Sequence, residues 1–402
     1  MKVSLLAAAV LSLATAAIAQ APATTAPADQ AAAPAAAPAP LTTPAVTGPL
    51  AWLPPANFDA GPFGKISANG IVTGVGRYQD NHIPGDDTGQ ASLSNGQIFL
   101  QKADGKVQYF IEVGAYTLPS LGAPFLPADK TVSATYGPVP VAFLKLPVGK
   151  TTQFLIGSLP TLIGAEYTFT FENMNVERGL LWNQENAINR GIQVNQTLGK
   201  YLTASFSWND GFYSNRYSWL SGSLTYVKGP HTLAFVAGGN AGKTAYQTFA
   251  TPVQNNSSIY NLIYTYSKGA WIIQPYYQYS NVPTNPSVGV FTGANTNGGA
   301  LLVSHAFKHG LSLPGRVEYI TSSGRSSDEG AINLLYGPGS NATSVTLTPT
   351  FQKGGMYVRG DLSWTHTGSY VPGDAFGKNG TNANQARAVA EIGFIFGNNI
   401  EK

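Results

Sequence analysis

The sequence of 402 residues contains no cysteine, which excludes disulfide bridges, thiolate metal sites and the lipidated cysteine that anchors a lipoprotein. Charge is also scarce, since charged residues make up 11% of the chain and the formal net charge is +3. No dense run of Lys or Arg occurs, so nucleic acid is not an expected partner. The sequence has no phosphate loop, metal-ligand cluster or dinucleotide fingerprint, and we therefore expect no cofactor and no metal.

Long hydrophobic runs are missing after the N-terminus. The first apolar run extends from Val3 to Ile18, follows Lys2 and ends in small residues up to Ala19, which is the pattern of a secretory signal cleaved after Ala19. An uncleaved membrane anchor is the alternative. No later segment reaches the roughly 18 apolar residues that a spanning helix requires. A mature chain that crosses a membrane must therefore cross it with β-strands.

The composition predicts three regions. Residues 20 to about 49 are dominated by Ala, Pro and Thr, and repeated prolines favour an extended spacer over a helix. We predict a signal peptide at 1–19, a disordered periplasmic linker at 20–62 and a transmembrane β-barrel at 63–402. A role of the linker in binding the cell wall or docking a partner is the alternative to a plain spacer.

The abundant residues indicate β-structure, because aromatic residues reach 11% and 45 residues are glycine. From about residue 65 the chain alternates between apolar and polar side chains in segments of roughly ten residues, which is the strand period. Leu202, Phe206 and Trp208 share one face, whereas Thr203 and Ser205 share the other. One face of such a strand suits lipid and the other suits water.

The connections between these segments are alternately short and long. Gly-containing hairpin turns are predicted at 103–105, 148–150, 199–200, 228–230, 268–269, 309–310 and 353–354. Longer loops are predicted near 79–90, 117–137, 159–188, 210–215, 240–256, 281–297, 322–341 and 367–385. This pattern predicts an all-β fold, a closed antiparallel transmembrane β-barrel of about 16 strands, with short turns on the periplasmic side.

The chain resembles the bacterial β-barrel porins of the outer membrane, in particular the porin-2 group. The resemblance is carried by the strand pair at 141–146 and 153–158 and by the segments at 159–166, 178–183, 189–194 and 206–211. It departs from many outer-membrane barrels at the C-terminus, where Phe396 is followed by further residues up to Lys402 and the aromatic assembly signal is in doubt. The resemblance implies an outer-membrane location, lipid and small polar solutes as partners, and a homotrimer as one assembly state.

In porins that the chain resembles, the third long loop folds into the lumen as a constriction. Here that loop, at about 159–188, carries the charged residues Glu166, Glu172, Glu177, Arg178 and Glu185. Inward positions on the predicted strands carry Glu112, Lys145, Arg316, Glu318, Arg359, Asp361, Arg387 and Glu391. Carboxylates in a narrow channel favour cations and polar solutes. An external, solvated loop is the alternative.

Two interpretations of the strand charges stay open. Arg316, Arg359 and Arg387 form a basic wall that faces the acidic loop, or Arg316 with Glu318 and Arg359 with Asp361 neutralise each other locally.

The leading functional hypothesis is a porin for passive diffusion of small hydrophilic solutes, and we expect no enzyme activity. A hydrolase built on the barrel is the runner-up. The sequence has five histidines, but no Gly-x-Ser-x-Gly motif that would supply a nucleophilic serine accompanies them. An adhesin or structural barrel is the third hypothesis, because Asn-, Thr- and Gly-rich loops permit binding.

Overall fold

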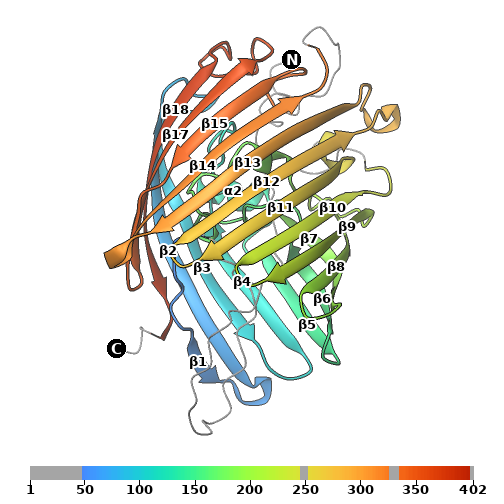
Figure 1. Cartoon of the computed structure of the whole chain (residues 1–402), viewed down its shortest axis with the longest axis vertical. Helices are drawn as coiled ribbons and strands as arrows, with labels where there is room; N and C mark the ends of the chain where they lie inside the picture. Colours follow the sequence, from blue (N-terminus) through green and yellow to red (C-terminus); the bar gives the residue numbers. More distant parts are fainter. Residues whose placement is uncertain (1–47, 245–251, 326–334, 399–402) are drawn as a thin grey trace.

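The computed structural model describes residues 48–244, 252–325 and 335–398. The predicted signal peptide and residues 20–47 of the predicted linker lie outside the described residues. The described chain forms a barrel of tilted strands (Figure 1). Each strand pairs antiparallel with its neighbours, and β18 pairs with β2 from Arg387↔Gln79 to Phe396↔Gly70, which closes the sheet.

The strands follow one another around the wall in chain order. Their bounds are β1 (Ala56–Asp59), β2 (Lys65–Gln79), β3 (Gly89–Lys102), β4 (Gln108–Tyr116), β5 (Val141–Val148), β6 (Thr152–Pro160), β7 (Ile188–Thr197), β8 (Leu202–Asn209), β9 (Trp219–Lys228), β10 (His231–Asn240), β11 (Ser258–Lys268), β12 (Trp271–Val282), β13 (Ala294–Ala306), β14 (Leu311–Ser322), β15 (Asn341–Leu347), β16 (Thr350–Lys353), β17 (Met356–Ser369) and β18 (Asn384–Phe396).

The wall has sixteen strand positions. Strands β15 and β16 both pair with β14 and β17 and occupy one position, interrupted at Pro349, which has no N–H for the ladder. Strand β1 pairs with Lys65–Ala68 at the start of β2, below the point where β18 ends. The closed sixteen-stranded antiparallel barrel that the turn pattern predicts is confirmed.

The two ends of the barrel differ in their connections, as the sequence predicts. The seven hairpin turns lie at one end, which we call the short-turn end, and the longer loops lie at the other. The helical elements are short: α2 (Ala128–Ala134), α3 (Pro252–Asn255), η1 (Gly61–Phe63), η2 (Thr170–Glu172), η3 (Leu181–Gln184), η4 (Pro286–Val288) and η5 (Lys308–Gly310). In the described part of the chain, no helix has the length and apolarity needed to span a membrane.

The alternation places apolar side chains outside and polar ones inside. Phe206 and Trp208 are about half exposed on the outer surface, at 51% and 50%, whereas Ser207 and Asn209 on the same strand are buried inside. The pattern repeats on β17, where Leu362 faces outward. An apolar exterior around a polar interior is the arrangement of a barrel in lipid, where each backbone polar group must be paired within the sheet.

Candidate functional site in the barrel lumen

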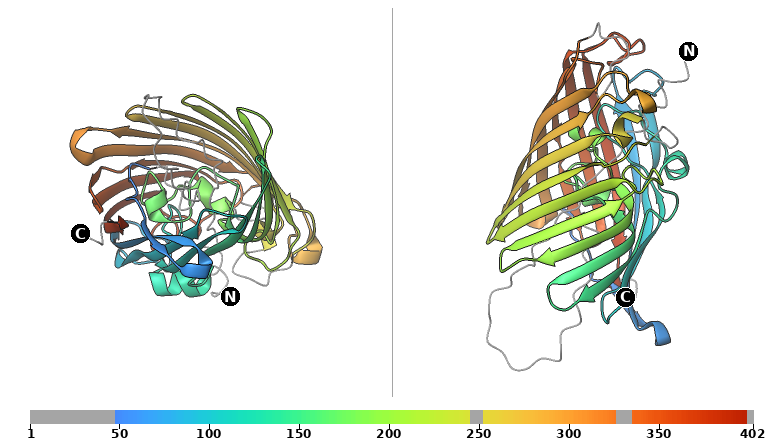
Figure 2. Two further views of the ribbon diagram at one scale, coloured as in Figure 1. Left: turned by 90° about the horizontal axis from the view of Figure 1, so that it is seen from below. Right: turned by 90° about the vertical axis from the view of Figure 1, so that its right-hand side faces the viewer.

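The long segment between β6 and β7, residues 161–187, lies inside the barrel. We call it the third loop. All of its residues except Asn183 are buried, and the view along the barrel shows its green turns within the ring of strands (Figure 2). Asn95 on β3 donates to the hydroxyl of Thr170, and Asn261 on β11, across the barrel from β3, accepts the N–H of Gly164, so the loop crosses the interior.

Arg316 on β14 joins the wall to the third loop. Its Nη1 donates to Glu166 Oε1 at 2.5 Å and to the carbonyl of Glu177 at 2.9 Å. Its Nε lies 3.2 Å from Glu318 Oε2, and Glu318 accepts a hydrogen bond from the N–H of Leu180 at 3.1 Å. Wall and loop therefore share one charged network.

Arg359 on β17 and Glu391 on β18 are direct cross-strand neighbours. The Nη2 of Arg359 pairs with Glu391 Oε2 at 2.8 Å. The same guanidinium donates to the carbonyls of Thr170 and Asn173 at 2.8 and 2.9 Å. One buried side chain thus neutralises a wall carboxylate and also binds the loop backbone around η2.

Asp361 and Arg387 bind the next part of the loop. Asp361 Oδ2 accepts from the N–H groups of Val176 and Glu177 at 2.6 and 3.0 Å, and Arg387 Nη1 donates to Glu177 Oε1 at 2.9 Å. The local pairing of Arg359 with Asp361 does not form. Directly opposite residues of paired strands lie closer than residues two apart on one strand, so Arg359 takes its cross-strand partner.

Each of the two arrangements that the sequence left open is present only in part, since the predicted pair of Arg316 with Glu318 forms and that of Arg359 with Asp361 does not. Arg316 and Arg387 reach carboxylates of the loop, whereas Arg359 is neutralised within the wall. These contacts all come from β14, β17 and β18, and we call this part of the lumen the ionic side.

A second part of the lumen, on β3 to β5 and separated from β18 by β2 alone, is aromatic. Phe99 on β3, Phe110 on β4 and Phe143 on β5 form a row with centroid separations of 6.3 and 5.6 Å. Phe171 of the loop meets Phe99 edge-to-face at 5.8 Å and stacks on Phe169 at 5.9 Å. We call this part the aromatic side.

Two charged groups of the loop make no hydrogen bond with their side chains among the described residues. Both oxygens of Glu185 and all three guanidinium nitrogens of Arg178 lack a partner among the described residues. Glu185 packs against Gly164, where a Cβ would lie 1.7 Å from its Oε2. Arg178 lies over the ring of Trp182 at 4.6 Å, a cation–π contact.

Burial shifts the acidity of both groups. It raises the pKa of Glu185 well above its usual range, and the nearby carboxylates of Glu166 and Glu318 raise it further. Burial lowers the pKa of Arg178 to about 9, against the opposing effect of neighbouring carboxylates. Glu185 is therefore the loop carboxyl with the clearest reason to hold a proton.

The remaining candidates lie outside the network that joins the loop to the ionic side. Glu172 accepts the N–H of Phe169 at 2.9 Å within the loop. Glu112, on β4, accepts Gln97 Nε2 at 2.5 Å. Lys145 on β5 is half-buried and has no carboxylate within ion-pair distance among the described residues.

Sequence reasoning missed the pair of Arg77 and Asp86. The guanidinium contacts both carboxylate oxygens at 2.8 and 2.9 Å, and the two side chains are almost fully buried. Arg77 lies on an inward position of β2, whose outward neighbours include Gly74 and Gly76. Because glycine carries no apolar signal, the alternation that would have marked Arg77 as inward-facing is weak there.

Carboxylates outnumber guanidinium groups among the buried residues associated with the lumen, by nine to five. The carboxylates are those of Asp86, Glu112, Glu166, Glu172, Glu177, Glu185, Glu318, Asp361 and Glu391, and the guanidinium groups are those of Arg77, Arg178, Arg316, Arg359 and Arg387. In the described residues no group of three or more His, Asp or Glu side chains is arranged to hold a metal ion.

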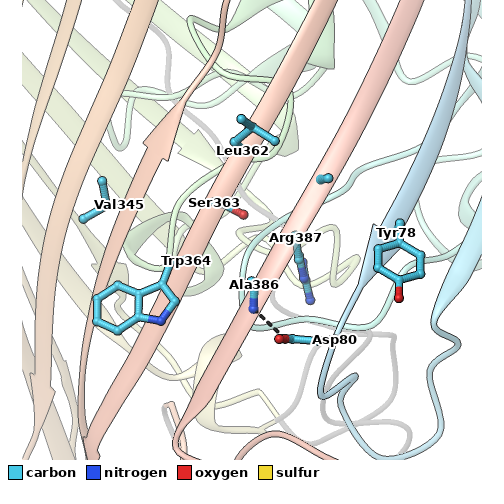
Figure 3. Close-up of a pocket in the computed structure, with 9 residues that line it drawn as sticks. Tyr78, Asp80, Val345, Leu362, Ser363, Trp364, Ala386 and Arg387 are labelled. Carbon is cyan, nitrogen blue, oxygen red and sulfur yellow. Dashed lines mark hydrogen bonds between the residues drawn. The ribbon is translucent and has the colours of Figure 1, made fainter.

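A groove of about 480 Å³ lies on the outside of the barrel, across β17, β18 and β2 (Figure 3). Small residues of β18, Ala386 and Ala388, lie between the larger side chains of Leu362, Trp364 and Tyr78. These larger side chains are exposed on the outer surface. The groove therefore belongs to the membrane-facing surface and not to the lumen.

The family is decided by a family model described as "Putative beta-barrel porin-2, OmpL-like", which matches residues 65–396. The chain belongs to this family. Membership places this porin-2 barrel in the outer membrane. The comparison with curated proteins finds no match.

Solved structures with a similar fold include outer-membrane proteins. The outer membrane channel DcaP of Acinetobacter baumannii has a TM-score of 0.56 at 10% identity, covering 85% of this chain and 100% of that chain. OmpT of Vibrio cholerae has a TM-score of 0.54 at 12% identity, covering 83% and 97%. OmpF of Salmonella typhi has a TM-score of 0.54 at 11% identity, covering 83% and 98%. At these identities the likeness establishes the porin fold alone.

Proposed function

We propose that this porin-2 barrel is a passive channel for small hydrophilic solutes, with the third loop as its constriction. The observation that carries the proposal is the position of the loop, which is bound on both sides of a closed, polar-lined lumen. Burial along β8 agrees with it: Thr203 and Ser205 are half-buried, whereas Ser207 and Asn209, farther from the short-turn end, are 3% and 1% exposed. The free space therefore narrows away from that end.

We further propose that the channel prefers cations. Nine buried carboxylates against five guanidinium groups give the lumen an excess of negative charge when its carboxyls are ionised. Confined charges of one sign attract counter-ions and repel co-ions. The dense packing of the loop favours a small conductance over that of a wide pore.

An enzymatic role has less support. All five histidines lie in the described residues, and none hydrogen-bonds a carboxylate there. The nucleophile, base and orienting carboxylate of a hydrolase are thus not assembled around a histidine. Within residues 48–244, 252–325 and 335–398, no observation in the lumen or loops favours an adhesin.

The test is single-channel recording of the full-length, correctly processed protein in planar bilayers. We expect small ohmic steps and, under a KCl gradient, a reversal potential toward that of K⁺. Folded barrels that insert without producing steps would contradict the channel and favour a structural barrel. An anion-selective reversal potential would contradict the cation preference.

Assembly and processing are part of the proposal. OmpT of Vibrio cholerae, similar in fold, is described in a trimer form, and we propose a homotrimer here, to be tested by light scattering of the purified protein. We also propose cleavage of the signal peptide after Ala19, which intact-mass measurement of the mature chain checks.

A further inference from the structure

Residues 48–55, just before β1, lie against the lumen contents at the short-turn end. Leu50 is 5% exposed and belongs to the same buried apolar cluster as the third loop. Gly48 lies against the loop backbone, because a Cβ at this position would be 2.5 Å from the carbonyl oxygen of Asn173. The segment that the sequence assigns to the linker therefore reaches the constriction.

Trp52 is the main contact between this segment and the loop. Its ring meets Phe99 of the wall edge-to-face at 5.4 Å and Phe171 of the loop at 5.5 Å. The ring thus joins the aromatic side to η2, which is bound from the ionic side through Arg359. Aromatic pairs of this geometry are stabilising beyond the area that they bury.

Hydrogen bonds attach the segment to the barrel rim at three places. The side chain of Gln352, beside the turn between β16 and β17, accepts from the N–H of Ala51 at 2.7 Å and donates to its carbonyl at 2.8 Å. Asn69 Nδ2 donates to the carbonyl of Leu53 at 3.1 Å. The N–H of Asn398, after β18, donates to the carbonyl of Pro54 at 2.8 Å. These contacts fix the path of the segment.

We propose that residues 48–55 form a strap that positions the third loop from the short-turn side and so sets the size of solute that passes. The inference rests on the proposed channel function. The strap joins the barrel rim to η2, which the ionic side binds through the carbonyls of Thr170 and Asn173 with Arg359 and through the hydroxyl of Thr170, which donates to Glu391. Without the indole ring, a space opens beside Phe171 and the loop gains freedom to move.

The test compares full-length wild type with Trp52→Ala in liposome-swelling assays using neutral sugars of increasing size. We expect the substitution to admit larger sugars and to raise single-channel conductance several-fold. Trp52→Phe, which keeps an aromatic ring, should restore most of the wild-type size limit. Phe63→Ala is the matched control, because Phe63 is an aromatic residue in the neighbouring η1 with 70% exposure.

A role confined to stability would lower the melting temperature of Trp52→Ala and leave the size limit unchanged, and that result would overturn the proposal. If Trp52→Ala does not fold, Leu50→Ala tests the same strap with a smaller change. An unchanged size limit and conductance in the folded Leu50→Ala protein would likewise contradict it.

A second measurement does not depend on transport. Because the native chain has no cysteine, Phe171→Cys gives a single reactive thiol under the strap. A small thiol reagent should label it faster in the Trp52→Ala background than with Trp52 present. Equal labelling rates in the two backgrounds would contradict the proposed role of the strap. A wild-type protein that shows no conductance would contradict only the proposed channel function.

Discussion

On the ionic side of the lumen the third loop is bound by guanidinium and carboxylate groups of β14, β17 and β18, whereas on the aromatic side it packs against rings of β3 and β4. Both sets of side chains are almost completely buried. The chemistry of the two sides nevertheless differs, because hydrogen bonds and ion pairs have defined partners and directions while ring packing mainly fills volume.

This difference assigns separate tasks to the two sides. Arg359 donates to two particular loop carbonyls, so it fixes where η2 lies. Phe171 contacts neighbouring rings of similar size, and such contacts tolerate small shifts. We infer that the ionic side determines the position of the loop and the aromatic side determines how tightly the space around it is filled.

The largest expected effect comes from Arg359→Ala on the ionic side. It leaves the carboxylate of Glu391 buried without its guanidinium partner, and breaking a buried ion pair in this way costs about 3–5 kcal/mol. Chemical unfolding of the purified barrel measures the loss, and the released loop should raise single-channel conductance. Val358→Ala, on the neighbouring membrane-facing position, is the control. A conductance equal to wild type would contradict the positional task of the ionic side.

Phe171→Ala tests the aromatic side and should cost about 3 kcal/mol, at the low end for a buried phenylalanine, because Phe169 and Phe99 can move toward the space. We expect conductance to rise while ion selectivity stays near wild type, since no charge is removed. The exposed Phe291→Ala is the matched control. A marked change in ion selectivity in Phe171→Ala would abolish the distinction between the two sides.

The smallest expected effect concerns Glu185, which packs against Gly164 within the third loop. Its pKa is raised by burial, so the folded chain binds a proton that the unfolded chain has released. The free energy of unfolding should therefore fall as pH rises from about 4.3, the ordinary value for Glu, toward the raised pKa.

Glu185→Gln should remove this pH dependence. At pH values above the raised pKa of Glu185, it should increase the free energy of unfolding by about 1–3 kcal/mol, which is the cost of an unsatisfied buried group. Unfolding curves of both proteins across a pH series check the expectation. Glu172→Gln is the comparison, because Glu172 accepts the backbone N–H of Phe169. Parallel pH profiles for wild type and Glu185→Gln would show that Glu185 is not the titrating group.

The strand framework could be predicted because its signal is local. Leu202 to Asn209 alternates residue by residue, and each tight turn carries its own glycine, so counting turns was enough to reach sixteen strands. The signal weakened where outward positions are glycine, as at Gly74 and Gly76 on β2, and Arg77 was missed for that reason.

The contacts of the candidate site could not be predicted in the same way. Glu166 contacts Arg316, which lies 150 positions away in the sequence. Arg359 pairs with Glu391 and not with Asp361, although Asp361 is only two positions away in the sequence. Such partners depend on strand register and on the path of the loop. The apolar residues Leu50 and Trp52 at the end of the Pro-rich stretch could have indicated that the strap is buried. The composition of the stretch assigned them to the linker instead.

The sequence by itself determined a closed barrel with an apolar exterior, because side-chain alternation and turn residues act over a few positions and lipid leaves no other way to pair the backbone of the strands. Only the tertiary structure decided which charges meet, which rings surround η2 and where residues 48–55 lie. Those outcomes depend on closure of β18 against β2 and on the fold of one loop within the cylinder, which bring together side chains that no local pattern connects.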